Sequence, residues 1–186
     1  MKTFYADLTS LSWYAQGKHH ITPKLPQELE QAYEERCVLQ KLHTAAGEVY
    51  IPPMAFKLCL LDTARYLSMP IPGKGKSTYT KHFKQGVQCT EPIMVGLKAE
   101  EVRIEKVFTL AQPNNPKSGR VWKWFPIIEH WAGTLQILAI DDIFTIDVIR
   151  KHLQVAGGIT GIGVWRPASG GLWGKFKLED VREETL

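Results

Sequence analysis

The spacing of apolar and polar residues predicts an alternation of strands and helices along the chain. Alternating apolar and polar residues, typical of half-buried strands, occur over 4–14, 101–112, 121–128, 131–142 and 174–181. A shorter strand is predicted at 47–51, and the chain becomes extended again from Cys89. A turn is expected over 113–120, where Asn, Pro, Ser and Gly are concentrated.

Two segments have the spacing of helices. After the Pro52-Pro53 pair, apolar residues recur at helical intervals from Phe56 to Ala64. The segment 145–158 has Thr145 in the N-cap position and a pair of glycines at its end, which are typical helix boundaries. The charge density of 27–43 suits either an exposed helix or a protruding arm, and both interpretations stay open.

A β-α unit followed by β-β-α-β is the element order of the ferredoxin-like, or RRM-type, fold. In this order the strand at 47–51 and the helix after it form the first β-α unit. We therefore predict an α+β fold with an antiparallel sheet, two helices, a basic loop insertion and a C-terminal glycine-rich loop. The 186 residues suit one domain over 1–186, with a protruding arm at 15–48 and a basic loop at 70–88.

Composition narrows the class of protein. No apolar run approaches the roughly 20 residues that cross a bilayer, and the first residues lack the apolar stretch of a signal peptide, so we expect a cytoplasmic protein without a membrane partner. The three cysteines have no CxxC spacing, which argues against a disulfide framework and against a zinc site. No cofactor is expected.

The distribution of charge is more informative than the net charge of +4. The windows 51–90, 113–125 and 148–178 together contain 14 Lys or Arg and one acidic residue, Asp62. A chain divided in this way can present a strongly basic face, for which a polyanion is the natural partner. Scattered, solvated lysines are the alternative interpretation.

Two motifs resemble the RAMP superfamily, the ferredoxin-like subunits of CRISPR effector complexes. The first is YIPPMAFK at 50–57, which is similar to the strand-to-helix junction of the backbone subunits, although Pro53 and Met54 replace the usual Gly and Ser. The second is the glycine-rich stretch at 157–176. The sequence also resembles a group of uncharacterised prophage-encoded proteins. The resemblance implies single-stranded RNA as the partner, with CRISPR effector subunits or self-association as further partners.

Glycines and helix ends supply a physical reason for the same partner. Gly161 and Gly163 would let a nucleic-acid backbone approach closely, and the helix N-terminus beside Lys57 would offer amides to a phosphate. We expect these two features to flank one groove and the glycine-rich segment to be a functional surface. Tight turns that only join a helix to a strand are the alternative.

The basic loop and the aromatic residues extend this prediction. The loop has lysines interleaved with hydroxyls and Tyr79, which suits phosphate contact and base stacking, whereas its GKGKS run lacks the spacing of a nucleotide-binding P-loop. Trp122 and Trp124 should share one sheet face and are expected in the core. Trp165 and Trp173 are better candidates for ligand contact. The residues expected to bind nucleic acid are Lys57, Lys74, Lys76, Tyr79, Lys81, His82, Lys84, Arg120, Lys123, Gly161, Gly163, Arg166, Trp173 and Lys175.

Motifs for catalysis are absent from the sequence, so a protein that binds nucleic acid without cleaving it is the leading hypothesis. Two alternatives stay open. The chain would be a phage-encoded mimic that inhibits a host CRISPR complex by protein–protein binding, or a phage nucleic-acid-processing enzyme that uses His19 and His20.

Overall fold

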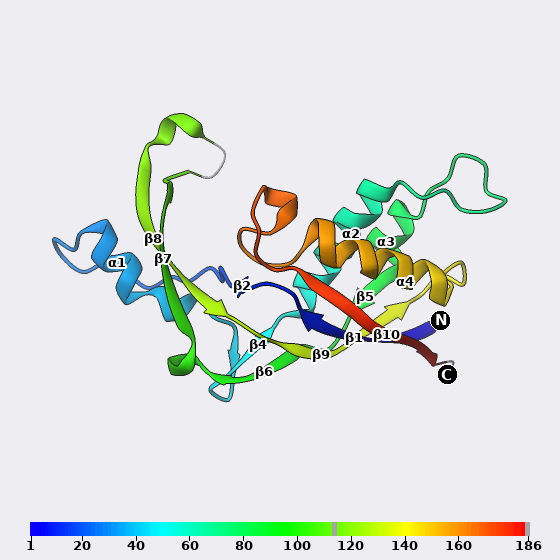
Figure 1. Cartoon of the computed structure of the whole chain (residues 1–186), viewed down its shortest axis with the longest axis horizontal. Coiled ribbons are helices and arrows are strands. Elements are labelled where there is room, and N and C mark those ends of the chain that lie inside the picture. The colour runs from blue at the N-terminus through cyan, green and yellow to red at the C-terminus, as the bar shows by residue number, and fades with distance from the viewer. Residues whose placement is uncertain (113–114, 185–186) are drawn as a thin grey trace.

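Four strands form an antiparallel sheet, and two helices cover one of its faces (Figure 1). The order of these six elements along the chain is β-α-β-β-α-β, as in the ferredoxin-like fold. The computed structural model describes residues 1–112 and 115–184. The strand order in the sheet is β10-β1-β9-β5. The core elements are β1 (Lys2–Ser10), α2 (Pro53–Leu67), β5 (Val87–Cys89), β9 (Ala132–Ala139), α4 (Ile146–Val155) and β10 (Phe176–Glu184). The predicted α+β, ferredoxin-like fold class is therefore confirmed.

The two faces of this sheet differ in chemistry because side chains alternate along each strand. Phe4, Ala6 and Leu8 of β1 are buried on the face toward the helices. On the other face, Asp7 accepts hydrogen bonds from Thr134 and Arg182 of the neighbouring strands. The outer face is thus polar and internally hydrogen-bonded.

Two inserted segments, the first of which contains the arm, interrupt this core. Residues 11–52 contain β2 (Tyr14–Ala15), α1 (Glu30–Arg36), η1 (Val38–Lys41), β3 (Thr44–Ala45) and β4 (Glu48–Ile51). Between β5 and β9 lie β6 (Ile93–Lys98), η2 (Ala99–Glu101), β7 (Arg103–Leu110), η3 (Pro116–Ser118) and β8 (Arg120–Ile128). Two further sheets result, with orders β2-β8-β7 and β3-β4-β6.

The segment predicted as an arm contains the helix α1, which lies beside β8 at one end of the molecule (Figure 1). Gln16 holds the start of the arm in place, because its side chain donates a hydrogen bond to the Tyr50 carbonyl and accepts one from the His43 amide. The expectation that β4 and α2 form the first β-α unit is wrong. β4 pairs with β3 and β6, and the core strand that precedes α2 is β1.

The second half of the predicted basic loop is regular structure. Residues 80–86 form the helix α3 (Thr80–Gly86), which leads directly into β5, so the loop covers only 68–79. Phe83 is fully buried and packs edge-on against Phe144, which anchors this short helix to the core. The predicted turn over 113–120 includes residues 113 and 114, which lie outside the described residues.

The helix α4 follows the prediction for residues 145–158 closely. Thr145 is its N-cap, and its side chain accepts a hydrogen bond from the Val148 amide. Beyond α4 the chain continues as a short π-helix, η4 (Ala156–Thr160), and a 3₁₀ turn, η5 (Pro167–Ser169), before β10 begins. In the part of the chain that the structure describes, no helix is both long and apolar enough to cross a bilayer.

Candidate functional site

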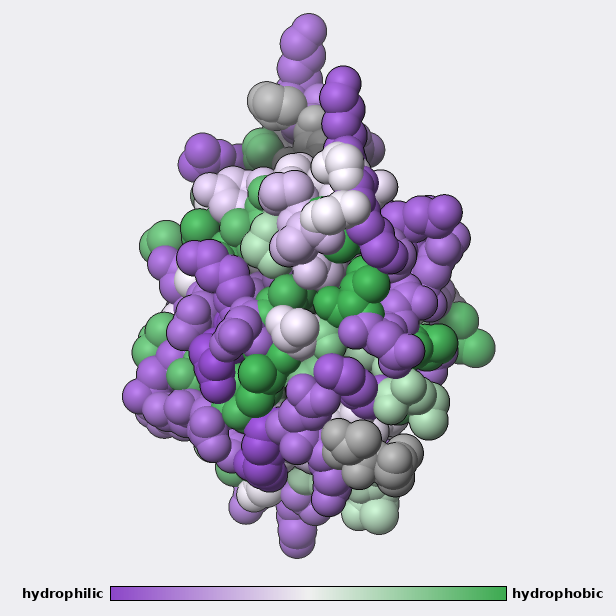
Figure 2. All heavy atoms as spheres, turned by 90° about the vertical axis from the view of Figure 1, so that its right-hand side faces the viewer, coloured by the Kyte–Doolittle hydropathy of each residue, from purple (hydrophilic) through white to green (hydrophobic). Residues whose placement is uncertain are grey.

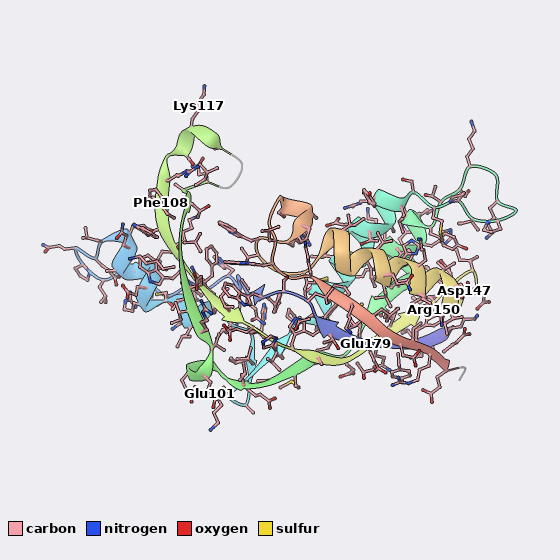
Figure 3. All side chains as sticks on the ribbon, viewed as in Figure 1. Glu101, Phe108, Lys117, Asp147, Arg150 and Glu179 are labelled. Atoms are coloured by element: carbon pink, nitrogen blue, oxygen red, sulfur yellow. The ribbon has the colours of Figure 1, made fainter. Side chains whose placement is uncertain are left out.

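A cleft of about 750 Å³ lies between three segments that are far apart in the sequence. The start of the arm at 16–20, with Tyr33 and Glu34 of α1, forms one wall. The hairpin of β7 and β8 and the residues 163–171 form the others. Figure 3 shows Phe108 on this hairpin and Lys117 pointing away from its tip.

Backbone hydrogen bonds hold the glycine-rich segment, residues 157–176, against residues 13–15, where the arm begins. The Val164 amide donates to the Ala15 carbonyl at 2.9 Å, and the Gly174 amide donates to the Trp13 carbonyl at 2.5 Å. The side of the cleft made by this segment is therefore connected to β2, which itself pairs with β8. Two of the three walls form one hydrogen-bonded unit.

Four aromatic rings gather where this segment meets the hairpin. Trp165 and Trp173 stack with ring centroids 5.3 Å apart, and both approach Phe125 at 5.9 Å. Trp13 lies 6.1 Å from Trp173, with the Arg103 guanidinium over its outer face. Of these rings, Phe125 and Trp165 line the cleft.

Lysines enter the cleft from the arm and the hairpin. Lys41 is bonded to Glu34 at 2.5 Å and to the Trp124 carbonyl, so its charge is matched within the protein. Lys123 donates to the Ala111 carbonyl at 2.9 Å, and Lys18 is exposed. Within the described residues neither Lys18 nor Lys123 has a carboxylate partner. The side chains that line the cleft therefore carry a net positive charge.

A second cationic region is the basic segment, residues 70–86, at the other end of the molecule from the hairpin (Figure 1). Lys74, Lys76, Lys81 and Lys84 are all exposed, and among the described residues none of them forms an ion pair. The side of the molecule that carries this segment faces the viewer in Figure 2 and is mostly hydrophilic. These four predicted residues are thus brought together, while Arg120 and Lys123 lie on the hairpin.

Two other residues of this region have structural roles. Tyr79 is buried, with its ring 6.0 Å from Phe144, so it is not available to stack on a base. His82 is paired with Asp141 at 2.7 Å, which links α3 to the loop that follows β9. The ring of Tyr79 therefore anchors the basic segment to the core.

Lys57 caps a helix instead of facing a ligand. Its ammonium group donates to the carbonyls of Phe83, Lys84 and Val87, which belong to the last turn of α3 and the residue after it. Burial lowers the pKa of Lys57. The ammonium group of Lys57 is therefore occupied by carbonyl groups of the protein.

The predicted glycines are enclosed by the protein itself. A methyl group on Gly161 would come within 2.6 Å of the Pro167 ring, and one on Gly163 within 2.5 Å of the Ala15 carbonyl oxygen. Both glycines have positive φ, +68° and +78°. Packing within the protein and backbone conformation thus explain why these two positions are glycines.

The remaining predicted residues surround the same segment. Arg166 is ion-paired with Asp62 of α2 at 2.9 Å. Trp173 belongs to the aromatic cluster, and the backbone amide of Lys175 donates to the Ser12 hydroxyl. Trp122 is partly exposed beside Phe108 on the outer hairpin face, so of the two tryptophans expected in the core only Trp124 is buried.

Histidines suggested for catalysis lie at the cleft without a catalytic constellation. His19 is exposed, and His20 packs against Tyr33 with ring centroids 6.0 Å apart. Neither histidine is hydrogen-bonded to a carboxylate within the described residues. No group of three His, Cys, Asp or Glu side chains in that part of the chain is arranged to hold a metal ion.

Several residues of the cleft had no signal in the sequence. Lys18, Lys41 and Phe125 come together only because the arm, β8 and the glycine-rich segment converge. Trp165 carried a signal, since it stands beside a basic residue in a stretch without an apolar pattern. Tertiary convergence of this kind leaves no local pattern from which it could be predicted.

Comparison with known proteins agrees with the fold. The sequence matches no family model and no curated protein. The structure is similar to a chain in the cryo-EM structure of the Type III-B Cmr-beta bound to cognate target RNA, with a TM-score of 0.52 and 10% identity. The alignment covers 98% of this chain and 60% of the matched chain. The similarity shows a shared fold, and this chain spans about three fifths of the matched chain's length.

Proposed function

We propose that the chain holds single-stranded RNA by its phosphate backbone and does not cleave it, as a RAMP-like protein of a CRISPR effector. The observation that carries the proposal is the basic segment, whose four lysines are exposed and without ion pairs among the described residues. Cations that are not matched within a protein are available to phosphates, and their binding releases the counterions of the nucleic acid.

The fold adds support of a different kind. The similar chain comes from a structure described as bound to cognate target RNA, and it shares the ferredoxin-like core. The outer face of the core sheet is a poor platform for RNA because its polar side chains bond to one another, as Asp7 does with Thr134 and Arg182. The basic segment and the cleft are better suited to the strand. Effector subunits would be the protein partners.

Absence of hydrolysis is part of the proposal. General acid–base cleavage needs two groups positioned around a ribose hydroxyl and its phosphate. His19 and His20 lie side by side in sequence at the cleft, but in the described residues no carboxylate hydrogen bond orients either ring. Binding without turnover therefore fits this arrangement better than nuclease activity.

A salt titration tests the proposal. Binding of a labelled single-stranded RNA of about 20 nucleotides is measured by anisotropy at about 50 mM and about 200 mM salt. If each lysine of the basic segment contacts one phosphate, a slope of about −0.7 per contact lowers the affinity roughly 50-fold over this range. Binding that is absent, or indifferent to salt, contradicts the proposal. The same samples, run on a denaturing gel with and without Mg²⁺, should contain intact RNA.

A further inference from the structure

We propose that the cleft binds one nucleotide of the strand, with its base beside Trp165 and its phosphate between Lys18 and Lys123. The inference rests on the proposed function, because it takes the bound strand to be the source of the nucleotide. It assigns a separate task to each cationic region: the basic segment contributes charge, and the cleft contains a pocket for a ring and a phosphate.

The size and lining of the cleft fit this ligand. Pockets for small molecules measure about 300–1,000 Å³ and combine apolar or aromatic walls with a few polar groups, and this cleft of about 750 Å³ lies within that range. Phe125, Trp165 and Tyr33 supply aromatic surface, and Lys18 and Lys123 supply charge. A nucleoside phosphate is a common ligand class that needs both an aromatic partner and a cation.

Backbone strain at Trp165 supports the assignment. Trp165 has φ of +59°, a left-handed conformation that bulky residues rarely adopt and that costs on the order of 1 kcal/mol or more. The surrounding structure maintains it, because the Trp173 amide donates to the Trp165 carbonyl and Val164 pairs with Ala15. A glycine at position 165 would adopt this conformation without strain. We therefore infer that a tryptophan is present because its ring is needed at the cleft.

An unsatisfied ring nitrogen lies in the wall formed by the start of the arm. His20 lines the cleft, and its buried Nδ1 has no hydrogen-bond partner among the described residues. An orphaned buried N–H is rarer than an under-satisfied acceptor, so in the neutral ring we assign the proton to Nε2. In that tautomer the Nε2–H group of His20 is a donor that no described protein group uses. An acceptor atom of a base or a phosphate could take its hydrogen bond.

Calorimetry with adenosine 5′-monophosphate, ribose 5-phosphate and adenosine as probes tests the proposal on the full chain. Because stacking on an aromatic ring and contact with a cation both contribute, the mononucleotide should bind at least fivefold more tightly than either fragment. Trp165→Gly should weaken mononucleotide binding at least fivefold, and it relieves the positive φ. Trp165→Asn, whose side chain also tolerates this conformation, is the second variant if the glycine lowers stability.

Matched variants separate the two halves of the ligand. Lys18→Gln with Lys123→Gln should weaken binding of the mononucleotide and of ribose 5-phosphate but leave adenosine unchanged. Trp122→Leu is the control, because this tryptophan lies on the outer hairpin face beside Phe108 and outside the cleft. Equal affinities for the mononucleotide and ribose 5-phosphate, or equal losses in Trp165→Gly and Trp122→Leu, would overturn the assignment.

Competition with RNA distinguishes this inference from the proposed function. Single-stranded RNA that displaces the mononucleotide supports both. RNA that binds with steep salt dependence to a protein with no mononucleotide affinity overturns the nucleotide pocket and leaves the proposed function intact. A mononucleotide that binds to a protein with no RNA affinity overturns the strand as its source and the proposed function with it.

Discussion

Glycines with positive φ occur in both the basic segment and the glycine-rich segment, but their surroundings differ. Around Gly73 and Gly75 of the basic segment an added methyl group would meet no atom within 4 Å. A methyl group on Gly161 would meet the Pro167 ring at 2.6 Å and the Gly174 carbonyl oxygen at 3.1 Å. The first pair lies in an open turn, and Gly161 is required by close packing within the protein.

The charges of the two segments differ in the same way. The lysines of the basic segment are exposed and without ion pairs in the described part of the chain, whereas Arg166 of the glycine-rich segment is paired with Asp62. Glycines beside cations therefore look alike in the sequence in both segments but have two different physical roles. Where the space around them is filled by the protein, they stabilise the fold, and where it is open, the cations remain available to a ligand.

The largest effect is expected from Gly161→Ala. The substitution forces a side chain into a positive φ and against a proline ring, and the combined strain and overpacking should lower the free energy of unfolding by about 2–5 kcal/mol. Gly75→Ala, with φ of +58° in open space, should cost only about 1 kcal/mol. Urea denaturation of both variants measures the difference. A Gly161→Ala protein of unchanged stability that no longer binds RNA would show that this segment is a binding surface after all.

The next effect concerns affinity. Replacing Lys74, Lys76, Lys81 and Lys84 with alanine should lower RNA affinity by about 10–100-fold and make the salt slope shallower by about 3, with little change in stability. A matched control removes four cations that are ion-paired: Lys2, Lys24, Lys177 and Arg182. Anisotropy titrations should show a much smaller loss for the control. Equal losses would mean that net charge, and not the basic segment, determines binding.

A pH-dependent effect tests how the basic segment is anchored. His152 is fully buried, with its ring centroid 4.2 Å from that of Phe83 of α3, and its Nδ1 bonds to the Val148 carbonyl. A carbonyl only accepts, so Nδ1 carries the proton, and the buried Nε2 has no partner among the described residues. Burial lowers the pKa of His152 below its usual 6.5.

Stability should therefore fall as the pH falls. Below pH 6.5 the unfolded chain takes up a proton that the folded protein excludes, until the lowered folded pKa is reached, with a slope of at most about 1.4 kcal/mol per pH unit. His43, whose pKa is also lowered by burial, contributes with the same sign. Denaturation of wild type and His152→Phe between about pH 7 and pH 5 isolates His152, and parallel pH profiles would contradict its role.

Local rules are enough to predict the two helices of the core, α2 and α4. Thr145 and the residues after it predict α4, because a cap and helical spacing depend only on neighbours in the chain. The pairing partners of strands depend on distant residues, so β7 and β8 were predicted as strands but not as a separate hairpin. The helix α3 was missed because Phe83 and Gly86 are the only buried residues in its seven positions.

The candidate site was harder to predict for the same reason. Lys57 reaches carbonyls about 30 positions later in the chain, and Arg166 reaches a carboxylate 104 positions earlier. Sequence spacing cannot show whether a cation is matched by such a distant partner. Exposed lysines in a stretch without acidic residues, as in the basic segment, were predicted correctly as exposed because no local partner exists and few distant ones reach a loop.

The smallest effect, and the sharpest test of the comparison, concerns Arg166. Its side chain donates to Asp62, and both side chains are less than one third exposed, at 24% and 31%. Arg166→Ala should lower the free energy of unfolding by about 0.5–1 kcal/mol and leave the salt slope of RNA binding unchanged, because the guanidinium is already occupied.

Asp62→Asn tests whether the ion pair with Asp62 is what keeps Arg166 from contacting RNA. It breaks the same ion pair and releases Arg166, so it should cost a similar amount of stability and leave RNA affinity equal or slightly higher. Asp62 also pairs with Arg65 at 3.0 Å, and Arg65→Ala is the control for that second contact. The double variant Arg166→Ala, Asp62→Asn then gives the coupling between the two residues. If Arg166→Ala instead makes the salt slope shallower by about 0.7, one phosphate contact belongs to the glycine-rich segment, and the separation of roles between the two segments fails.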